Sequence, residues 1–254
     1  IVWAKFTNAT WRGDGFYYSA YDAPEKGLET SAKNEVQKVY YHRIGTPQSD
    51  DVLFYQNPAQ PLRFYGVGLN DEETLMFLTE SGMDQGYNLY VRDLRVADSQ
   101  FIQMTADASK TYSPVEMIGD SIYILTNQGA PRYRLMVADV RKPGMTDWHE
   151  VVGEQDGVLQ DVLFLPADRM ILTYSKDNCT EAWLYSVKGE RLRRIELPTF
   201  GSASFSGSRK QDECFFSFTS YTVPTTIYRF DSATGKSQVE SQPKVNVRLN
   251  DYTT

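Results

Sequence analysis

The chain has 254 residues and a formal net charge of −7, with an isoelectric point near 5.0. This acidic balance argues against a nucleic-acid partner, because binding to phosphates needs a basic patch. The sequence has no apolar run of about 18 residues, so no membrane-spanning helix is expected. Aromatic residues make up 13% of the chain, a composition that suits half-buried strands better than helices.

Five short aliphatic and aromatic runs recur along the chain, and each ends in a polar or acidic residue. The runs begin 50, 46, 49 and 43 positions apart, at Val39, Leu89, Leu135, Leu184 and Ile227. A strand period of about 40–50 residues is typical of β-propeller blades, because one small sheet cannot bury both of its faces and must stack against its neighbours. The repeat therefore predicts an all-β propeller with about five four-stranded blades.

The first blade is expected at residues 5–58, with its first strand at residues 5–11. The pair Asp14-Gly15 then predicts a hairpin turn. The stretch 22–36 carries charged and polar residues and almost nothing apolar, which predicts an exposed, mobile loop.

Four further blades are expected at residues 64–108, 113–157, 159–200 and 202–244. In each of them an apolar run occupies the place of a second strand, at residues 75–79, 122–126, 170–174 and 214–219. The blades account for residues 1–244, and residues 245–254 are expected to form a linker. No closing segment is recognisable, which predicts an arc of a larger ring rather than a closed five-bladed one.

The cysteines and histidines do not indicate a disulfide framework, a metal site or a catalytic base. The chain contains two of each, Cys179, Cys214, His42 and His149. Two cysteines are too few for a disulfide framework, and the spacing matches no metal-ligand pattern. We expect both cysteines to be thiols on strands, with a disulfide bridge between neighbouring blades as the alternative, and we expect no metal site and no cofactor. His149 lies in a run expected to form an outer strand, where a solvated side chain is favoured over a general base.

The first residues are Ile1, Val2 and Trp3, without an initiator methionine or a signal peptide. We therefore expect this chain to be a piece of a longer protein. For that protein we expect a cytoplasmic location, with the periplasm as the alternative.

Three stretches go beyond the general propeller pattern: residues 37–51 (QKVYYHRIGTPQSDD), 126–135 (TNQGAPRYRL) and 218–228 (FTSYTVPTTIY). In length, order and spacing they closely resemble segments of the prolyl oligopeptidase family. The resemblance implies that the chain forms the later five blades of a seven-bladed propeller. It also implies that residues 245–254 lead into an α/β-hydrolase domain.

In that family the hydrolase domain carries the Ser, Asp and His that cleave peptides after proline, and the propeller admits only short peptides. The resemblance thus implies a monomeric serine endopeptidase whose partners are short proline-containing peptides and its own hydrolase domain. The chain itself lacks the Gly-x-Ser-x-Gly turn that carries such a serine, so no catalytic residue is expected in it. Two alternatives stay open: a free-standing, protein-binding propeller without enzymatic activity, and a related peptidase that removes dipeptides or larger acyl groups.

Some family members also use a propeller arginine that donates to a substrate carbonyl, with a nearby cysteine that lines the cavity. Aligning residues 79–84 (TESGMD) with that pattern places Glu80 at the arginine position and Met83 at the cysteine position. A carboxylate cannot donate a hydrogen bond as a guanidinium does. We therefore name Glu80 and Met83 as candidate substrate-cavity residues, but favour a solvent-facing loop for Glu80.

Overall fold

The structure is a computed structural model that describes residues 1–83, 86–106 and 108–244. The described residues form twenty strands in five four-stranded antiparallel sheets, with two single 3₁₀ turns. The predicted all-β fold with five four-stranded blades is therefore confirmed. Residues 245–254, predicted to be a linker, lie outside the described residues. Within the described ranges, no helix has the length and apolar character needed to cross a membrane.

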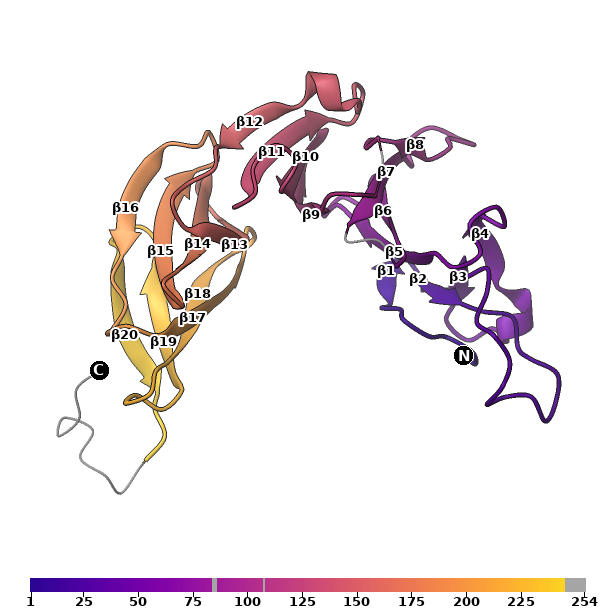
Figure 1. Cartoon of the computed structure of the whole chain (residues 1–254), viewed down its shortest axis with the longest axis horizontal. Coiled ribbons are helices and arrows are strands. Elements are labelled where there is room, and N and C mark those ends of the chain that lie inside the picture. Colours follow the sequence, from indigo (N-terminus) through magenta and orange to yellow (C-terminus); the bar gives the residue numbers. More distant parts are fainter. Residues whose placement is uncertain (84–85, 107, 245–254) are drawn as a thin grey trace. The chain divides into compact units, whose positions relative to one another are not determined.

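Every sheet is a meander in which each strand pairs with the next one in the chain (Figure 1). The first sheet contains β1 (Thr10–Arg12), β2 (Gly15–Ala20), β3 (Lys38–Arg43) and β4 (Val52–Gln56). The second contains β5 (Phe64–Leu69), β6 (Leu75–Ser81), β7 (Tyr87–Asp93) and β8 (Ile102–Gln103). The third contains β9 (Tyr112–Ile118), β10 (Ser121–Thr126), β11 (Arg134–Asp139) and β12 (His149–Val152).

The fourth sheet contains β13 (Val158–Leu165), β14 (Arg169–Lys176), β15 (Cys179–Ser186) and β16 (Arg191–Ile195). The fifth contains β17 (Ser202–Ser208), β18 (Gln211–Thr219), β19 (Thr226–Asp231) and β20 (Lys236–Ser241). The chain divides into two compact units, residues 1–128 with 137–149 and residues 129–136 with 150–254. Each unit is described below by itself.

The repeat seen in the sequence is the third strand of each sheet, namely β3, β7, β11, β15 and β19. A third strand lies inside its sheet with a strand on each side, and side chains on its packed face are buried, as Leu89 and Val91 are in β7. In β7, β11 and β19 an aspartate at the end of the strand closes the following turn. Asp93, Asp139 and Asp231 each accept a hydrogen bond from the backbone N–H two residues later, at 2.8–2.9 Å. The repeated aspartate is therefore a turn residue.

Neighbouring sheets bury their faces against one another, as the propeller hypothesis requires. In the first unit, Tyr17 and Val39 of the first sheet pack with Tyr65, Met76 and Leu78 of the second. In the second unit, a matching cluster joins the fourth and fifth sheets through Leu165, Ile171, Leu184, Phe205 and Phe216. In each of these two pairs, the facing sides of the sheets are buried because each sheet supplies half of the shared core.

Among the described strands, only β6 pairs with β5, and side chains of residues 10, 19 and 37 hydrogen-bond to the other edge of β5. Thr10 Oγ1 donates to the carbonyl of Val67, and Ser19 Oγ donates to the carbonyl of Tyr65, both at 2.7 Å. Gln37 Oε1 accepts from the N–H of Tyr65 at 2.6 Å. These bonds fix the position of the second sheet along the first, since a shift by one residue would turn the bonded groups away.

Replacing Gln37 with alanine should therefore lower the free energy of unfolding by about 2 kcal/mol. Gln37 is 1% exposed, and its loss leaves the N–H of Tyr65 buried without an acceptor. Urea denaturation followed by tryptophan fluorescence measures the change. Gln211→Ala, at an exposed position of β18, is the control and should change stability by less than about 0.5 kcal/mol. Equal effects of the two substitutions would contradict the prediction.

The predicted strand at residues 5–11 is shorter in the structure, where only Thr10–Arg12 forms β1. Residues 2–8, here named the N-terminal strap, are instead irregular apart from an isolated bridge between Ala4 and Ala20. Positive φ angles at Trp3 (57°) and Phe6 (54°) interrupt the strand alternation. Side chains replace ladder bonds along the strap: Gln48 binds the N–H and the carbonyl of Val2 at 2.7 and 3.0 Å, and Thr7 Oγ1 accepts from the N–H of Ser19 at 2.7 Å.

Candidate functional site

Glu80 lies inside strand β6 and is buried, so the favoured prediction of a solvent-facing loop was wrong. It pairs with Tyr65 of β5 on one side and Asn88 of β7 on the other, and it is 3% exposed. Alternate residues of β6 are buried from Met76 through Leu78 to Glu80. The pleat therefore turns the carboxylate toward the core, because strand side chains alternate between faces.

The buried carboxylate of Glu80 has polar partners on three sides. Asn88 Nδ2 donates to Oε1 at 3.2 Å, and the hydroxyl of Tyr90 donates to Oε2 at 3.4 Å. The Nε of Arg63 lies 3.8 Å from Oε1. A charge in this position costs several kcal/mol without such partners, so the three contacts together explain how a glutamate is tolerated here.

Three tyrosines surround this carboxylate and stay protonated. Burial, and then the negative charge of Glu80, raises the pKa of Tyr55, Tyr65 and Tyr90 above the usual value. Their hydroxyls are therefore hydrogen-bond donors across the physiological pH range. Glu80 therefore lies among three neutral tyrosine side chains, and it is 3% exposed.

Met83 occupies the opposite kind of environment, since its side chain is 92% exposed. It borders a shallow hollow of about 200 Å³ with Gln60, Leu62, Arg63 and Gly82. Arg63 packs against Gly82 so closely that a Cβ there would lie 2.7 Å from Nη1. Arg63 therefore connects the two predicted residues, since it contacts Glu80 below the surface and borders the hollow beside Met83. Arg63 was not predicted from the sequence. Its position immediately before β5, the strand that pairs with Glu80, could have indicated it.

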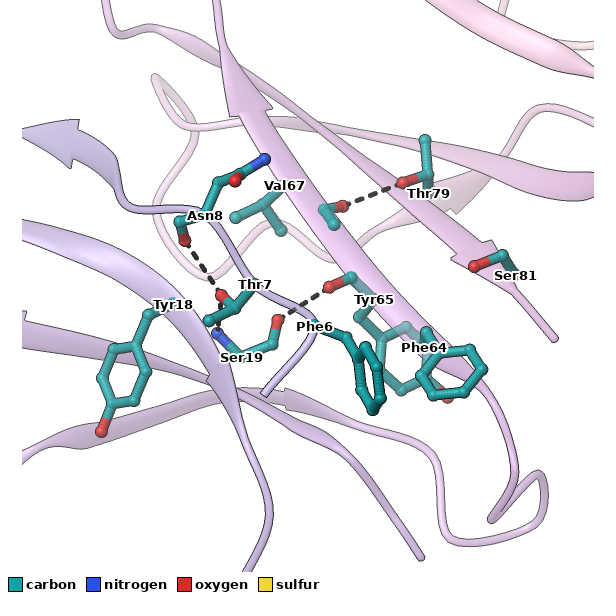
Figure 2. A pocket seen from close by; sticks show the side chains of 11 residues that line it. Phe6, Thr7, Asn8, Tyr18, Ser19, Phe64, Tyr65, Val67, Thr79 and Ser81 are labelled. Atoms are coloured by element: carbon teal, nitrogen blue, oxygen red, sulfur yellow. Dashed lines mark hydrogen bonds between the residues drawn. The ribbon is translucent and has the colours of Figure 1, made fainter. Parts of the chain in front are cut away.

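A larger hollow of about 640 Å³, here named the β5 hollow, lies in the same unit. Its walls come from the N-terminal strap, β2, β5 and β6, and none of its 11 lining residues carries a formal charge at neutral pH (Figure 2). The rings of Phe6 and Phe64 close one end, and Asn8 and Ser81 lie on other sides. No sequence motif predicted it, because its walls come from separate parts of the chain.

The two histidines do not form a catalytic arrangement. His149 is exposed at the start of β12, as predicted. His42 Nδ1 lies 2.7 Å from Asp51 Oδ1, and both side chains are largely buried. The second oxygen of Asp51 accepts from the hydroxyl of Tyr18 at 2.6 Å, and burial followed by this bond raises the pKa of Tyr18. The histidine and aspartate thus join β2, β3 and the turn after β3.

Cys179 and Cys214 are both free thiols on strands, as predicted. Burial raises the pKa of Cys214 to about 11, so this thiol remains protonated at neutral pH. Among the residues that the structure describes, no group of three or more His, Cys, Asp or Glu side chains is arranged to hold a metal ion.

The sequence matches a known domain family over nearly its whole length. The family model described as prolyl oligopeptidase, N-terminal beta-propeller domain, matches residues 1–243. The chain belongs to this family. The resemblance read from residues 37–51, 126–135 and 218–228 is thereby confirmed.

Known relatives of this prolyl oligopeptidase propeller are similar to it in both sequence and structure. A prolyl endopeptidase of Elizabethkingia meningoseptica is 31% identical over 98% of this chain and 35% of its own length. A solved prolyl endopeptidase structure is 26% identical, covers 99% of this chain and 37% of its own, and has a TM-score of 0.88. Prolyl oligopeptidase B of Galerina marginata shares the fold at a TM-score of 0.88 and 24% identity, over 98% of this chain and 36% of its own. The chain thus spans about a third of the length of these proteins.

Proposed function

We propose that this chain is the propeller part of a serine endopeptidase of the prolyl oligopeptidase type, which cleaves short peptides after proline. The observation that carries the proposal is the family match over residues 1–243, together with 31% identity to a protein named prolyl endopeptidase. In the longer protein, the Ser, Asp and His of an α/β-hydrolase domain would perform the cleavage. The chain would supply five blades of a seven-bladed ring, in a monomeric protein of the cytoplasm.

The propeller's proposed task is to control access to the catalytic serine. A rigid stack of sheets suits this task, because the side chains that join the first and second sheets hold them in one position. A folded protein would then be excluded by size, while a short extended peptide would pass. The propeller contributes selection of substrates, and bond cleavage belongs to the hydrolase domain.

Glu80 and Met83 enter this proposal with different roles. Met83 would contact a peptide directly, and its exposure beside the small hollow supports this role. Glu80 is buried and cannot take over the donor role of the family's arginine, since it accepts hydrogen bonds from Asn88 and Tyr90. Its proposed role is to orient Arg63, whose guanidinium borders the hollow.

The full-length protein should hydrolyse a short fluorogenic peptide that has proline before the leaving group, and a serine-directed covalent inhibitor should abolish this activity. A peptide with alanine in place of that proline is the matched control and should be cleaved much more slowly. A folded protein with an exposed proline should resist cleavage. Absence of hydrolysis by a well-folded full-length protein would contradict the proposal and favour a protein-binding propeller.

A further inference from the structure

The N-terminal strap covers the part of β2 that lies beyond its pairing with β1. β1 pairs with β2 only at residues 15–17. Beyond them, the carbonyl of Trp3 accepts from the N–H of Tyr21 at 3.1 Å. Thr7 Oγ1 accepts from the N–H of Ser19 at 2.7 Å, as Figure 2 shows. These contacts and the isolated bridge are separate from one another, so the strap can leave β2 without breaking a strand ladder.

Backbone strain in the strap favours its departure from β2. Trp3 and Phe6 have φ angles of 57° and 54°, a left-handed conformation that is unfavourable for a residue with a Cβ and exceptional for a bulky one. Strained residues persist only where surrounding contacts hold them. Because Phe6 is 69% exposed, burial of its ring contributes only part of that hold. Hydrogen bonds from neighbouring side chains must supply the rest.

Gln48, in the 3₁₀ turn after β3, binds the first residue of the strap. Its Oε1 accepts from the N–H of Val2 at 2.7 Å, and its Nε2 donates to the carbonyl of Val2 at 3.0 Å. A second attachment is Gln37, whose Nε2 donates to the carbonyl of Lys5 at 2.9 Å. Gln37 is 1% exposed, whereas Val2 is 63% exposed. Opening of the strap therefore begins at its solvent-exposed end, where Gln48 binds Val2.

The hydroxyl of Tyr18 fixes the orientation of the Gln48 carboxamide. Nε2 of Gln48 also donates to this hydroxyl, at 3.2 Å, and the hydroxyl donates its own proton to Asp51 Oδ2 at 2.6 Å. Asp51, with a side chain that is 3% exposed, can only accept, and its other oxygen lies 2.7 Å from Nδ1 of His42. A carboxamide rotated by half a turn would place its oxygen against the oxygens of Val2 and Tyr18. The buried carboxylate therefore determines the direction of each hydrogen bond that leads to the strap.

We propose that the strap is a conformational latch, which opens away from β2 as one unit and is held closed by Gln48. Tyr18, bonded to the buried Asp51, acts through Gln48 by orienting its carboxamide. Opening uncovers the two N–H groups of β2 that the strap binds. It also removes one wall of the β5 hollow, since residues 6–8 line that hollow (Figure 2). The width of the hollow thus depends on a chain of hydrogen bonds that begins on β3.

Hydrogen–deuterium exchange of the full-length protein, read at single residues by mass spectrometry, tests this proposal. The reporters are the N–H groups of Ser19 and Tyr21, which bond to the strap and not to Gln48. Gln48→Ala should raise both exchange rates about tenfold, because two hydrogen bonds that hold the strap are lost. Tyr18→Phe removes the group that orients Gln48 and should raise them about threefold. The matched control is Ser49→Ala, at an exposed hydroxyl of the same turn, which should leave both rates unchanged.

The pattern of exchange decides each part of the proposal. Equal rates in Q48A and S49A would show that Gln48 does not hold the strap. Acceleration at Tyr21 without acceleration at Ser19 would show that the strap does not open as one unit. In the Q48A background, Tyr18→Phe should add nothing, because Tyr18 acts through Gln48, and a further increase would overturn the relay.

Exchange in β6 separates local opening from a general loss of stability. The N–H groups of β6 lie in a sheet core that the strap does not pair with, so their rates should stay the same in Q48A and S49A. An equal acceleration of β6 and of the reporters in Q48A would overturn the latch. Gln48 lies in a surface turn and Tyr18 is buried, so Q48A remains decisive if Y18F fails to fold.

Discussion

Replacing Arg63 with alanine is expected to lower the free energy of unfolding by about 2–3 kcal/mol. Its Nε lies 3.8 Å from the carboxylate of Glu80, whose side chain is 4% exposed. Removal of one partner from a buried ion pair usually costs about 3–5 kcal/mol, because the other charge stays buried without compensation. The expected loss is smaller here, since Asn88 and Tyr90 still donate to Glu80. Urea denaturation followed by tryptophan fluorescence measures it.

Two comparison variants make this result interpretable. Arg43→Ala removes an exposed arginine that pairs with Asp14 at 3.0 Å, where both side chains are about two-thirds exposed, and should change stability by less than about 1 kcal/mol. The double variant R63M/E80M removes both charges and should recover most of the stability lost in R63A. If R63A and R43A are equally stable, the buried pair contributes no more than a surface contact and the prediction fails.

Gly189→Ala is expected to destabilise the protein by at least about 3 kcal/mol. Gly189 lies in the turn between β15 and β16 with a φ of +87°, a conformation that costs an alanine about 1–2 kcal/mol. A Cβ would also lie 1.9 Å from the carbonyl oxygen of Val151 in β12. The backbone must shift to relieve this overlap, because a carbonyl oxygen cannot rotate away as a flexible side chain can.

Gly45→Ala is the matched control for this prediction. Gly45 occupies the equivalent turn between β3 and β4 with nearly the same φ of +86°, but nothing lies within 4 Å of the position of its Cβ. The free energy of unfolding of G45A should therefore fall only by the cost of the positive φ, about 1–2 kcal/mol. Thermal or urea unfolding of both variants separates the two contributions. Equal losses in G189A and G45A would rule out a cost from the contact with Val151.

The sequence predicted the fold well where burial repeats along the chain. The third strands were recognisable because they bury alternate residues on a packed face, as Leu89 and Val91 show. The second-strand predictions at residues 75–79, 122–126, 170–174 and 214–219 also fall within β6, β10, β14 and β18. The exposed character of residues 22–36 followed from the lack of apolar side chains. These features depend on local composition, which a single sequence contains.

Features that depend on contacts between distant segments could not be predicted in the same way. Residues 5–9 have strand-like composition, yet side chains such as Thr7 and Gln37 supply their hydrogen bonds in place of a strand ladder. Glu80 was expected to face solvent because glutamate is rarely buried. Its burial becomes intelligible only with Arg63, Asn88 and Tyr90 around it.

The candidate site was predicted only in part. Glu80 and Met83 were named from a resemblance, and their roles in a substrate cavity stay a prediction. The structure adds Arg63 between them, and it adds the β5 hollow, whose walls combine the strap with strands up to 75 residues later in the chain. No local pattern marks such a hollow, because each wall alone has the sequence of an ordinary strand or loop.

The bonded edge of β5 also affects aggregation. An uncovered edge strand offers a row of free N–H and C=O groups to which a strand of another molecule can add. Thr10, Ser19 and Gln37 already occupy such groups on β5, so a second chain would have to displace internal bonds to pair there. β20 differs, since it ends its sheet and all six of its residues are exposed. Charged side chains on an edge strand discourage such pairing, so Lys236 and Glu240 are expected to protect the exposed edge of β20 in place of internal hydrogen bonds.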